Sequence, residues 1–173
     1  NIISKFKPEE IARMLGENDI SFFCLYYLRD YFVPSSNNDV RNLGGVHYDI
    51  WNELQFLFVD DGGNNEEFIL PRGIGKSTII NKALGCWRHC YRKCRFTIVI
   101  GNKALDAENF IKGTRQMLEN KRIVEAFGIL VDKKSRTVNS EELELTNDTK
   151  LQAFSWGSSV RGVTYEPKSG GIY

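Results

Sequence analysis

Apolar residues recur at helical spacing along much of the chain. The pattern predicts helical structure over residues 7–32, with Pro8 near its start, over Tyr48–Phe58, and over Lys76–Tyr91. A polar turn at 34–38 separates the first two stretches, and a Gly/Asn-rich loop, 61–65, follows the second. The third stretch carries one broad apolar face, formed by Ile79, Ile80, Ala83, Leu84, Trp87 and Tyr91.

Short apolar runs predict strands at four places. Glu67–Leu70 is followed by Pro71, and Arg95–Gly101 is a β-branched run of the kind found in buried parallel strands. Leu143–Thr146 and Lys150–Trp156 are joined by Asn147 and Asp148, which predicts a β-hairpin.

Two further helices are expected between these strands. One runs from Ala104 to about Asn120 with Asn102 as its N-cap, and the other runs from Lys121 to Phe127 and stops at Gly128. The order of elements predicts an α/β fold of the doubly wound type: a mostly parallel sheet with flanking helices and a β-hairpin.

The most informative segment is Pro71-Arg72-Gly73-Ile74-Gly75-Lys76-Ser77-Thr78. An apolar run, a tight glycine turn and Gly-Lys-Ser at the start of a helix make a phosphate-binding loop, in which backbone N–H groups surround the anion. In such a loop the lysine reaches the β- and γ-phosphates, and the serine hydroxyl binds Mg²⁺. The full G-x-x-x-x-G-K-[ST] pattern is not met, because Leu70 stands at the first glycine position. An ordinary loop that happens to contain Gly-Lys-Ser is the alternative.

Length and charge limit the class of protein. The chain has 173 residues, 42% of them hydrophobic, which suits one compact domain, and it has no apolar run near 18 residues, so no membrane span is expected. The first residue is Asn1, so we expect part of a longer protein. Residues 1–70 carry 5 Lys/Arg and 12 Asp/Glu, whereas residues 71–173 carry 18 and 10. The basic half suits a polyphosphate or nucleic-acid partner, although it is equally what scattered surface charge gives.

Three of the four cysteines, Cys86, Cys90 and Cys94, recur every fourth residue around His89. This spacing raises the alternative of a metal or redox site. Structural zinc sites usually combine cysteine pairs from separate segments, and Cys86 and Cys90 fall on the apolar helix face. We therefore interpret them as core cysteines, which pack as small hydrophobic side chains.

A phosphate loop that hydrolyses its nucleotide needs a further carboxylate to hold Mg²⁺. Asp60 and Asp61 follow an apolar run, but they precede the loop, and right-handed βαβ winding places the metal-holding strand after it. We expect the carboxylate strand beyond Tyr173, and hence negligible ATP hydrolysis by this chain alone.

Several segments recur in a characteristic order: His47–Leu54, Pro71–Ser77, Ile98–Asn102, Ala107–Phe110, Leu118–Lys121 with Phe127–Gly128, and Trp156–Gly162. This order of motifs resembles the ATPase domain of the large terminase subunit, the DNA-packaging motor of tailed phages. The resemblance covers about residues 45–173.

The resemblance implies roles for matching positions. Gly73, Gly75, Lys76, Ser77 and Thr78 would hold ATP and Mg²⁺, with Pro71 and Ile74 in the same loop, and Arg72 would contact the γ-phosphate. Arg161 would act as an arginine finger on a neighbouring subunit's ATP, or it is a surface arginine. Tyr48 or Trp51 would stack on adenine, or pack in the core.

The resemblance also implies an organisation and partners. Residues 1–45 would be a helical extension and 46–173 part of the ATPase domain, with the nuclease domain elsewhere. Double-stranded DNA, the small terminase subunit and the portal protein would be partners of a homo-oligomeric ring in the host cytoplasm. The alternatives are a helicase-like ATPase, a nucleotide kinase, or a module that binds nucleotide without hydrolysing it.

Overall fold

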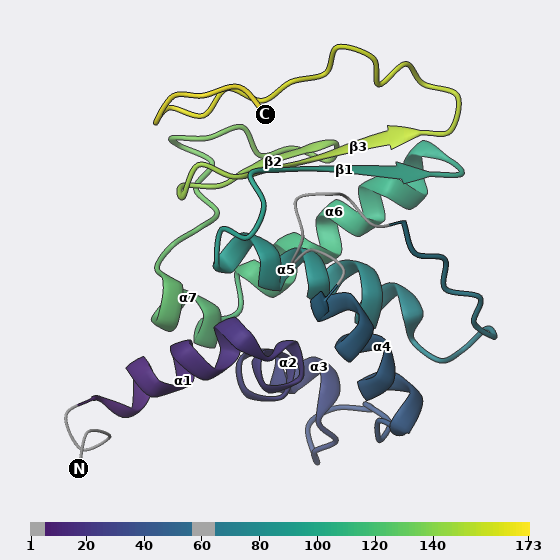
Figure 1. The fold of residues 1–173 in the computed structure, drawn as a ribbon, viewed down its shortest axis with the longest axis vertical. Helices are drawn as coiled ribbons and strands as arrows, with labels where there is room; N and C mark the ends of the chain where they lie inside the picture. The colour runs from purple at the N-terminus through teal and green to yellow at the C-terminus, as the bar shows by residue number, and fades with distance from the viewer. Residues whose placement is uncertain (1–5, 57–64) are drawn as a thin grey trace. The chain divides into compact units, whose positions relative to one another are not determined.

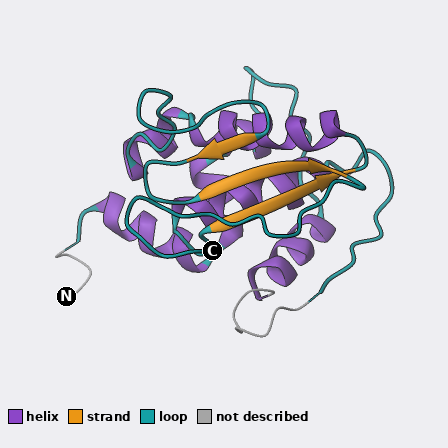
Figure 2. Ribbon diagram, turned by 90° about the horizontal axis from the view of Figure 1, so that it is seen from above, coloured by secondary structure: helices purple, strands orange, loops and turns teal. Residues whose placement is uncertain are grey.

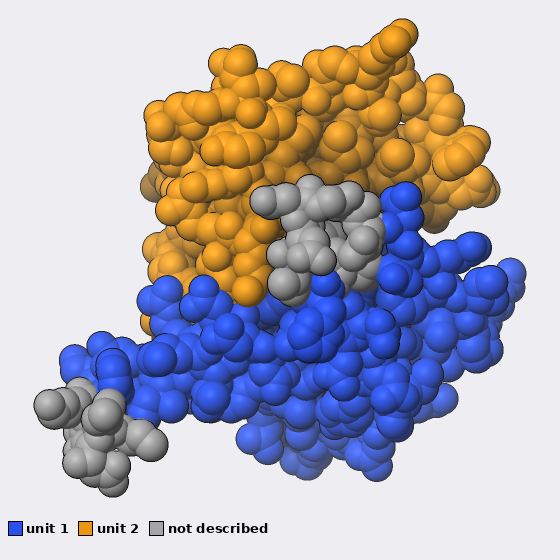
Figure 3. Space-filling model, viewed as in Figure 1, with its two compact units in different colours: residues 1–87 blue, residues 88–173 orange. Residues whose placement is uncertain are grey.

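The computed structural model describes residues 6–56 and 65–173. The chain gathers into two compact units, Asn1–Trp87 and Arg88–Tyr173, which Figure 3 shows in different colours. The division after Trp87 lies inside a helix. The domain boundary expected after residue 45 falls within the first of these units.

Helices build the first unit. The helical pattern over residues 7–32 is confirmed, but it is divided into α1 (Pro8–Asn18), α2 (Ile20–Tyr27) and α3 (Arg29–Phe32). The first break lies at Asp19, whose carboxylate accepts a hydrogen bond of 2.9 Å from the backbone N–H of Phe22. This bond satisfies a free donor in the first turn of α2, so a new helix starts there. A turn at 34–38 follows, and α4 spans Gly45–Phe56.

Trp51 of α4 lies at the centre of this unit. Its side chain has no solvent exposure, and the ring of Phe32 packs edge-on against it, with 5.2 Å between ring centroids. The indole Nε1–H donates a hydrogen bond of 3.2 Å to the backbone carbonyl of Ile79. This bond ties α4 to the helix that follows the glycine loop.

The predicted helix after the loop is confirmed, with an unexpected first part. Ser77–Lys82 is a π-helix, labelled η2, and α5 continues over Ala83–Cys90. The predicted apolar face is buried at Ile79, Ala83 and Trp87 and half-buried at its other three positions. The core cysteines Cys86 and Cys90 are buried as expected. The indole of Trp87 donates a hydrogen bond of 2.7 Å to the carbonyl of Gly16 in α1. Periodicity alone does not predict the π-helix, because such a segment is a rare, short bulge inside an otherwise α-helical run and six residues are too few to establish a different repeat.

The second unit contains a small mixed sheet, so the α/β class is confirmed. Its strands are β1 (Phe96–Gly101), β2 (Glu142–Glu144) and β3 (Lys150–Ser155), in the order β1-β3-β2 (Figure 2). β1 runs parallel to β3, and β2 runs antiparallel to β3. The parallel strand and the hairpin are both confirmed. In the described residues the sheet is mixed rather than mostly parallel.

The helix α6 (Ala104–Leu118) follows β1 and packs on one face of the sheet (Figure 1), and α7 (Lys121–Phe127) follows it. The N-cap of α6 is Lys103, one residue later than expected, and the Lys103 N–H donates to the Asp106 carboxylate at 3.2 Å. Gly101 is required at the turn into α6. A Cβ there would lie 2.7 Å from both the Ala107 nitrogen and the Lys103 oxygen.

The face of β1 that points away from α6 is partly exposed, so the prediction of a fully buried strand is wrong. Ile98 is 38% exposed and Ile100 is 50% exposed. The helix α6 covers the other face, where Leu151 and Ala153 of β3 are buried. On the exposed face the C-terminal segment contributes Tyr165, whose ring lies 6.1 Å from that of Phe96. An apolar run in sequence does not reveal that only one side of a strand is covered.

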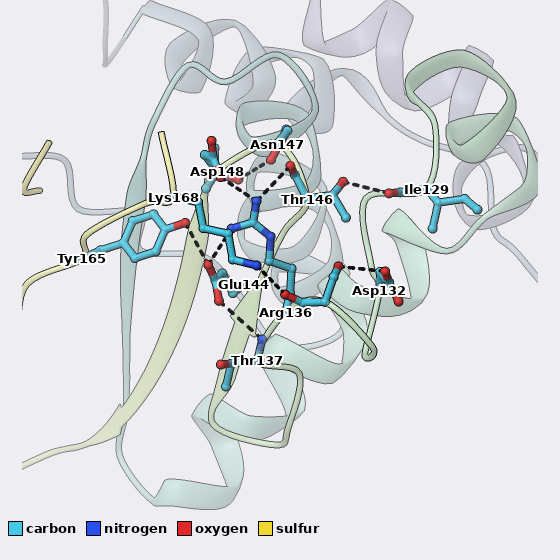
Figure 4. A network of polar contacts seen from close by, with 12 residues as sticks. Ile129, Asp132, Arg136, Thr137, Glu144, Thr146, Asn147, Asp148, Tyr165 and Lys168 are labelled. Carbon is cyan, nitrogen blue, oxygen red and sulfur yellow. Dashed lines mark hydrogen bonds and ion pairs between the residues drawn. The ribbon is translucent and has the colours of Figure 1, made fainter. Parts of the chain in front are cut away.

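A polar network fixes the hairpin (Figure 4). The Arg136 side chain is only 8% exposed and pairs with Glu144 at 2.8 Å and with Asp148 at 2.6 Å. The Tyr165 hydroxyl donates to Glu144 at 3.4 Å, which attaches the C-terminal segment to the same cluster. Burial acts to raise the pKa of Asp148, but hydrogen bonds from Arg136 and Ser169 outweigh it and leave that pKa below its usual value.

The strand predicted at Glu67–Leu70 is wrong in this structure, because residues 65–71 are irregular. A strand exists only when a neighbour completes its hydrogen bonds, and no described residue pairs with this run. Within residues 6–56 and 65–173, no helix combines the length and apolarity needed to cross a bilayer.

Candidate functional site

The glycine loop has the backbone geometry of an anion-binding turn. Gly73 has φ +88° and Gly75 has φ +76°, whereas the φ of Ile74 between them is not positive, and Lys76 has φ −49°. Alternating signs of φ aim successive N–H groups toward one side and form the concave arrangement that binds anions. Only glycine adopts the positive values readily, so the two glycines permit the turn.

The N–H groups of this loop are free to bind a ligand. From Gly73 to Ser77 they make no hydrogen bond within the described residues, whereas the next two, of Thr78 and Ile79, both donate to the carbonyl of Gly75 at 2.9 and 3.0 Å. The loop is solvent-exposed, Lys76 and Ser77 included. Unpaired N–H donors at the start of a helix, with a lysine among them, are the arrangement to which polyanions bind.

Lys76 already lies over the loop. Its ammonium group donates a hydrogen bond of 3.1 Å to the carbonyl of Leu70. An ammonium held across the loop is positioned to exchange this carbonyl for a phosphate oxygen, since both are hydrogen-bond acceptors.

His47 of α4 connects the loop to the preceding segment. Its Nδ1 accepts the backbone N–H of Gly44 at 2.8 Å, and its Nε2 lies 3.1 Å from the carbonyl of Ile74. Nδ1 also lies 3.1 Å from the carbonyl of Gly44. Since the Ile74 carbonyl can only accept, its hydrogen bond with the ring requires the proton on Nε2, which leaves Nδ1 to accept from the Gly44 N–H. Sequence reasoning missed this role, since a histidine at a helix start has no distinctive pattern.

A cavity of about 310 Å³ lies beside the loop within the same unit. The backbone of Gly73–Gly75 and the side chains of Thr78 and Ile79 form one wall. The remaining lining residues are Tyr31, Phe32, Val40, Arg41, Asn42, Leu43 and His47. None of these was predicted as a site residue, because the chain reversal between α3 and α4 that assembles them leaves no motif in the sequence.

The two aromatic residues expected to stack on a base differ in position. Trp51 is fully buried and bonded to Ile79, so its faces are occupied by the core. Tyr48 is 37% exposed and its ring lies edge-on to Trp51, with 5.9 Å between centroids. Neither residue lines the cavity. Stacking on Tyr48 remains a prediction.

The two arginines of the predicted site are both exposed. Neither Arg72 nor Arg161 forms an ion pair with the described residues. Arg72 is part of the loop itself, and Arg161 belongs to the second unit in a turn ending at Gly162. Each guanidinium is therefore available for a phosphate.

The donor set fits a magnesium ion only as part of a nucleotide complex. The exposed Ser77 hydroxyl directly follows the loop, and Mg²⁺ commonly takes one or two protein ligands, substrate phosphates and waters. Asp60 and Asp61 lie outside the described residues. Within those residues, no group of three or more His, Cys, Asp or Glu side chains could hold a metal.

His89 is the most perturbed titratable group of the second unit. It is fully buried, its Nε2 lies 2.9 Å from the Thr97 hydroxyl, and its Nδ1 has no hydrogen-bond partner among the described residues. Burial and then the charge of Arg88 lower its pKa to about 3. The Thr97 hydroxyl also lies 3.4 Å from the Cys94 thiol. The neutral imidazole is therefore part of a packed polar group in the core.

Comparison with known proteins identifies no family. No protein-family model matches the chain, and no solved structure matches it. An oxidoreductase named swnR from Metarhizium robertsii is 30% identical over 84 residues, which is 46% of this chain and 28% of that protein. The chain thus covers less than a third of the length of this curated relative.

Proposed function

We propose that this chain is the ATP-binding part of a DNA-packaging motor ATPase of the terminase large-subunit type. In this role it couples ATP hydrolysis to movement of double-stranded DNA into a capsid. The observation that carries the proposal is the loop Pro71–Ser77, with alternating backbone angles, free N–H groups and Lys76 lying across it. Arg72 and the later motif ending in Arg161–Gly162 direct the proposal toward a packaging ATPase.

In this proposal each group has a separate task. The loop N–H groups and Lys76 bind the β- and γ-phosphates, and Ser77 provides one ligand of Mg²⁺, which neutralises phosphate charge. Arg72 contacts the γ-phosphate. Arg161 approaches the ATP of a neighbouring subunit in a ring that assembles with DNA, the small terminase subunit and the portal protein in the host cytoplasm.

The similarity to an oxidoreductase raises dinucleotide binding as another candidate. A dinucleotide-binding turn has the pattern G-x-G-x-x-G/A after a strand, with the third glycine permitting close packing of helix and strand. Here Thr78 occupies the third position, and residues 65–71 form no strand. The missing strand counts equally against both kinds of loop, because a triphosphate-binding loop also follows a strand. Thr78 at the third position, together with Lys76 and Ser77 at the helix start, favours a triphosphate over a dinucleotide.

The test is ATP hydrolysis by the intact packaging protein with and without double-stranded DNA. We expect DNA to stimulate turnover and Lys76→Ala to abolish it. Stimulation by a nucleoside and not by DNA would favour a nucleotide kinase. Tight ATP binding with no turnover under any of these conditions would favour a non-hydrolysing module.

A further inference from the structure

We propose that the cavity beside the phosphate loop, bounded by Tyr31, Phe32 and the segment Val40–Leu43, is the subsite for the base of a purine nucleoside triphosphate. The inference rests on the proposed nucleotide-binding function and deepens it. In this proposal the base lies in a cavity that the sequence did not indicate, and not against Tyr48 or Trp51 of α4.

The cavity is continuous with the phosphate loop. Gly73, Ile74 and Gly75 contribute both to the turn with free N–H groups and to the wall of the cavity. A ligand whose phosphates occupy the turn therefore has its remaining part beside the cavity. The volume of about 310 Å³ lies at the lower end of the range for small-molecule pockets, about 300–1,000 Å³. This suits one heterocycle with its sugar.

The lining of the cavity is largely apolar. Tyr31, Val40 and Leu43 are half-buried and provide apolar surface, and the nearly buried Phe32 and Ile79 lie behind them. Planar heterocycles bind to such walls through dispersion and stacking, and they then need a few polar groups to fix their orientation.

The cavity lining also contains polar side chains without hydrogen-bond partners among the described residues. Asn42 lines the cavity, is exposed, and makes no hydrogen bond within the described residues. Its amide offers donors and an acceptor together, which can pair with the donor and acceptor edge of adenine. Arg41 beside it is equally exposed and carries a charge that suits the negative ligand.

His47 acts as a positioning residue for both parts of the site. Its ring lines the cavity and its Nε2–H holds the carbonyl of Ile74, in the middle of the loop. Gly44, which directly follows Leu43 of the cavity wall, holds the ring orientation through its N–H bond to Nδ1. The cavity wall and the loop are therefore mechanically linked through one imidazole.

The experiment measures binding of ATP, CTP and inorganic tripolyphosphate, each with Mg²⁺, by isothermal titration calorimetry on the whole chain. We expect ATP to bind at least about tenfold more tightly than tripolyphosphate, with CTP between them. Val40→Phe, which fills the cavity, and Asn42→Ala, which removes the amide, should reduce ATP affinity toward that of tripolyphosphate. Both should leave tripolyphosphate affinity unchanged, which also shows that the variants are folded.

Val46→Phe is the matched control for Val40→Phe. Val46 is 46% exposed and does not line the cavity, so the same substitution there should not change the preference for ATP. Equal affinity of the wild type for ATP and tripolyphosphate would overturn the base subsite while leaving the phosphate loop intact. A preference for ATP that survives Val40→Phe but is lost in Tyr48→Ala would also overturn it. Failure of both ligands to bind would refute the proposed function, and this inference with it.

Discussion

Replacing Trp51 by phenylalanine separates a core role from a nucleotide contact. Phenylalanine keeps an aromatic face but removes the indole N–H, which donates to the Ile79 carbonyl at 3.2 Å. Removing the donor of this buried hydrogen bond costs about 1–3 kcal/mol, and the volume lost from a fully buried ring adds about 1 kcal/mol. We therefore expect the free energy of unfolding to fall by roughly 2–4 kcal/mol.

The assay is thermal unfolding together with ATP titration below the transition. For a chain of this size each kcal/mol lowers Tm by about 2–4 °C, so a drop of roughly 5–15 °C is expected, with ATP affinity unchanged while the protein is folded. Phe56→Leu, at the 64% exposed end of the same helix, is the control and should change stability by less than about 0.5 kcal/mol. An unchanged Tm with weakened ATP binding would show that Trp51 meets the nucleotide and not the core.

Two further predictions concern the second unit. The pKa of His89 is lowered from 6.5 to about 3, so the unfolded chain binds more protons between these values, and stability should fall by about 2 kcal/mol from pH 7 to pH 5. Urea unfolding at both pH values should show a smaller loss in His89→Gln, and an equal loss would refute the assignment. Gly101→Ala should destabilise by about 1–3 kcal/mol, because its Cβ would lie 2.7 Å from backbone atoms. Gly45→Ala, with open space around it, should be neutral or stabilising, and equal effects at both positions would contradict the tight turn.

The sequence predicts the parts of this fold that depend on local patterns. The helix after the loop, β1 and the hairpin through Asn147 and Asp148 all have strong periodicity or turn chemistry, and all three are found. Glu67–Leu70 fails because a strand depends on a pairing partner elsewhere in the chain. The exposure of Ile98 and Ile100 was not predictable for a related reason, since burial is decided by what covers a face and not by the run itself.

The candidate site divides in the same way. The phosphate loop is one continuous segment, so its glycines and lysine are visible in sequence. The cavity is built from Tyr31, Val40–Leu43 and His47, which come together only because α3 and α4 pack against each other through Phe32 and Trp51. Residues such as Asn42 carry no signal of their own, because an asparagine in a loop ordinarily serves a turn.

The most direct test of the account is ATP binding by the wild-type chain and by Lys76→Ala. The comparison uses calorimetric titration with Mg²⁺ present and with Lys112→Ala as a control that removes the same charge from an exposed position of α6. We expect the wild type and Lys112→Ala to bind ATP alike and Lys76→Ala to lose at least about tenfold in affinity, equivalent to about 1.4 kcal/mol. Binding that is indifferent to Lys76, or no binding by the wild type, would contradict this expectation.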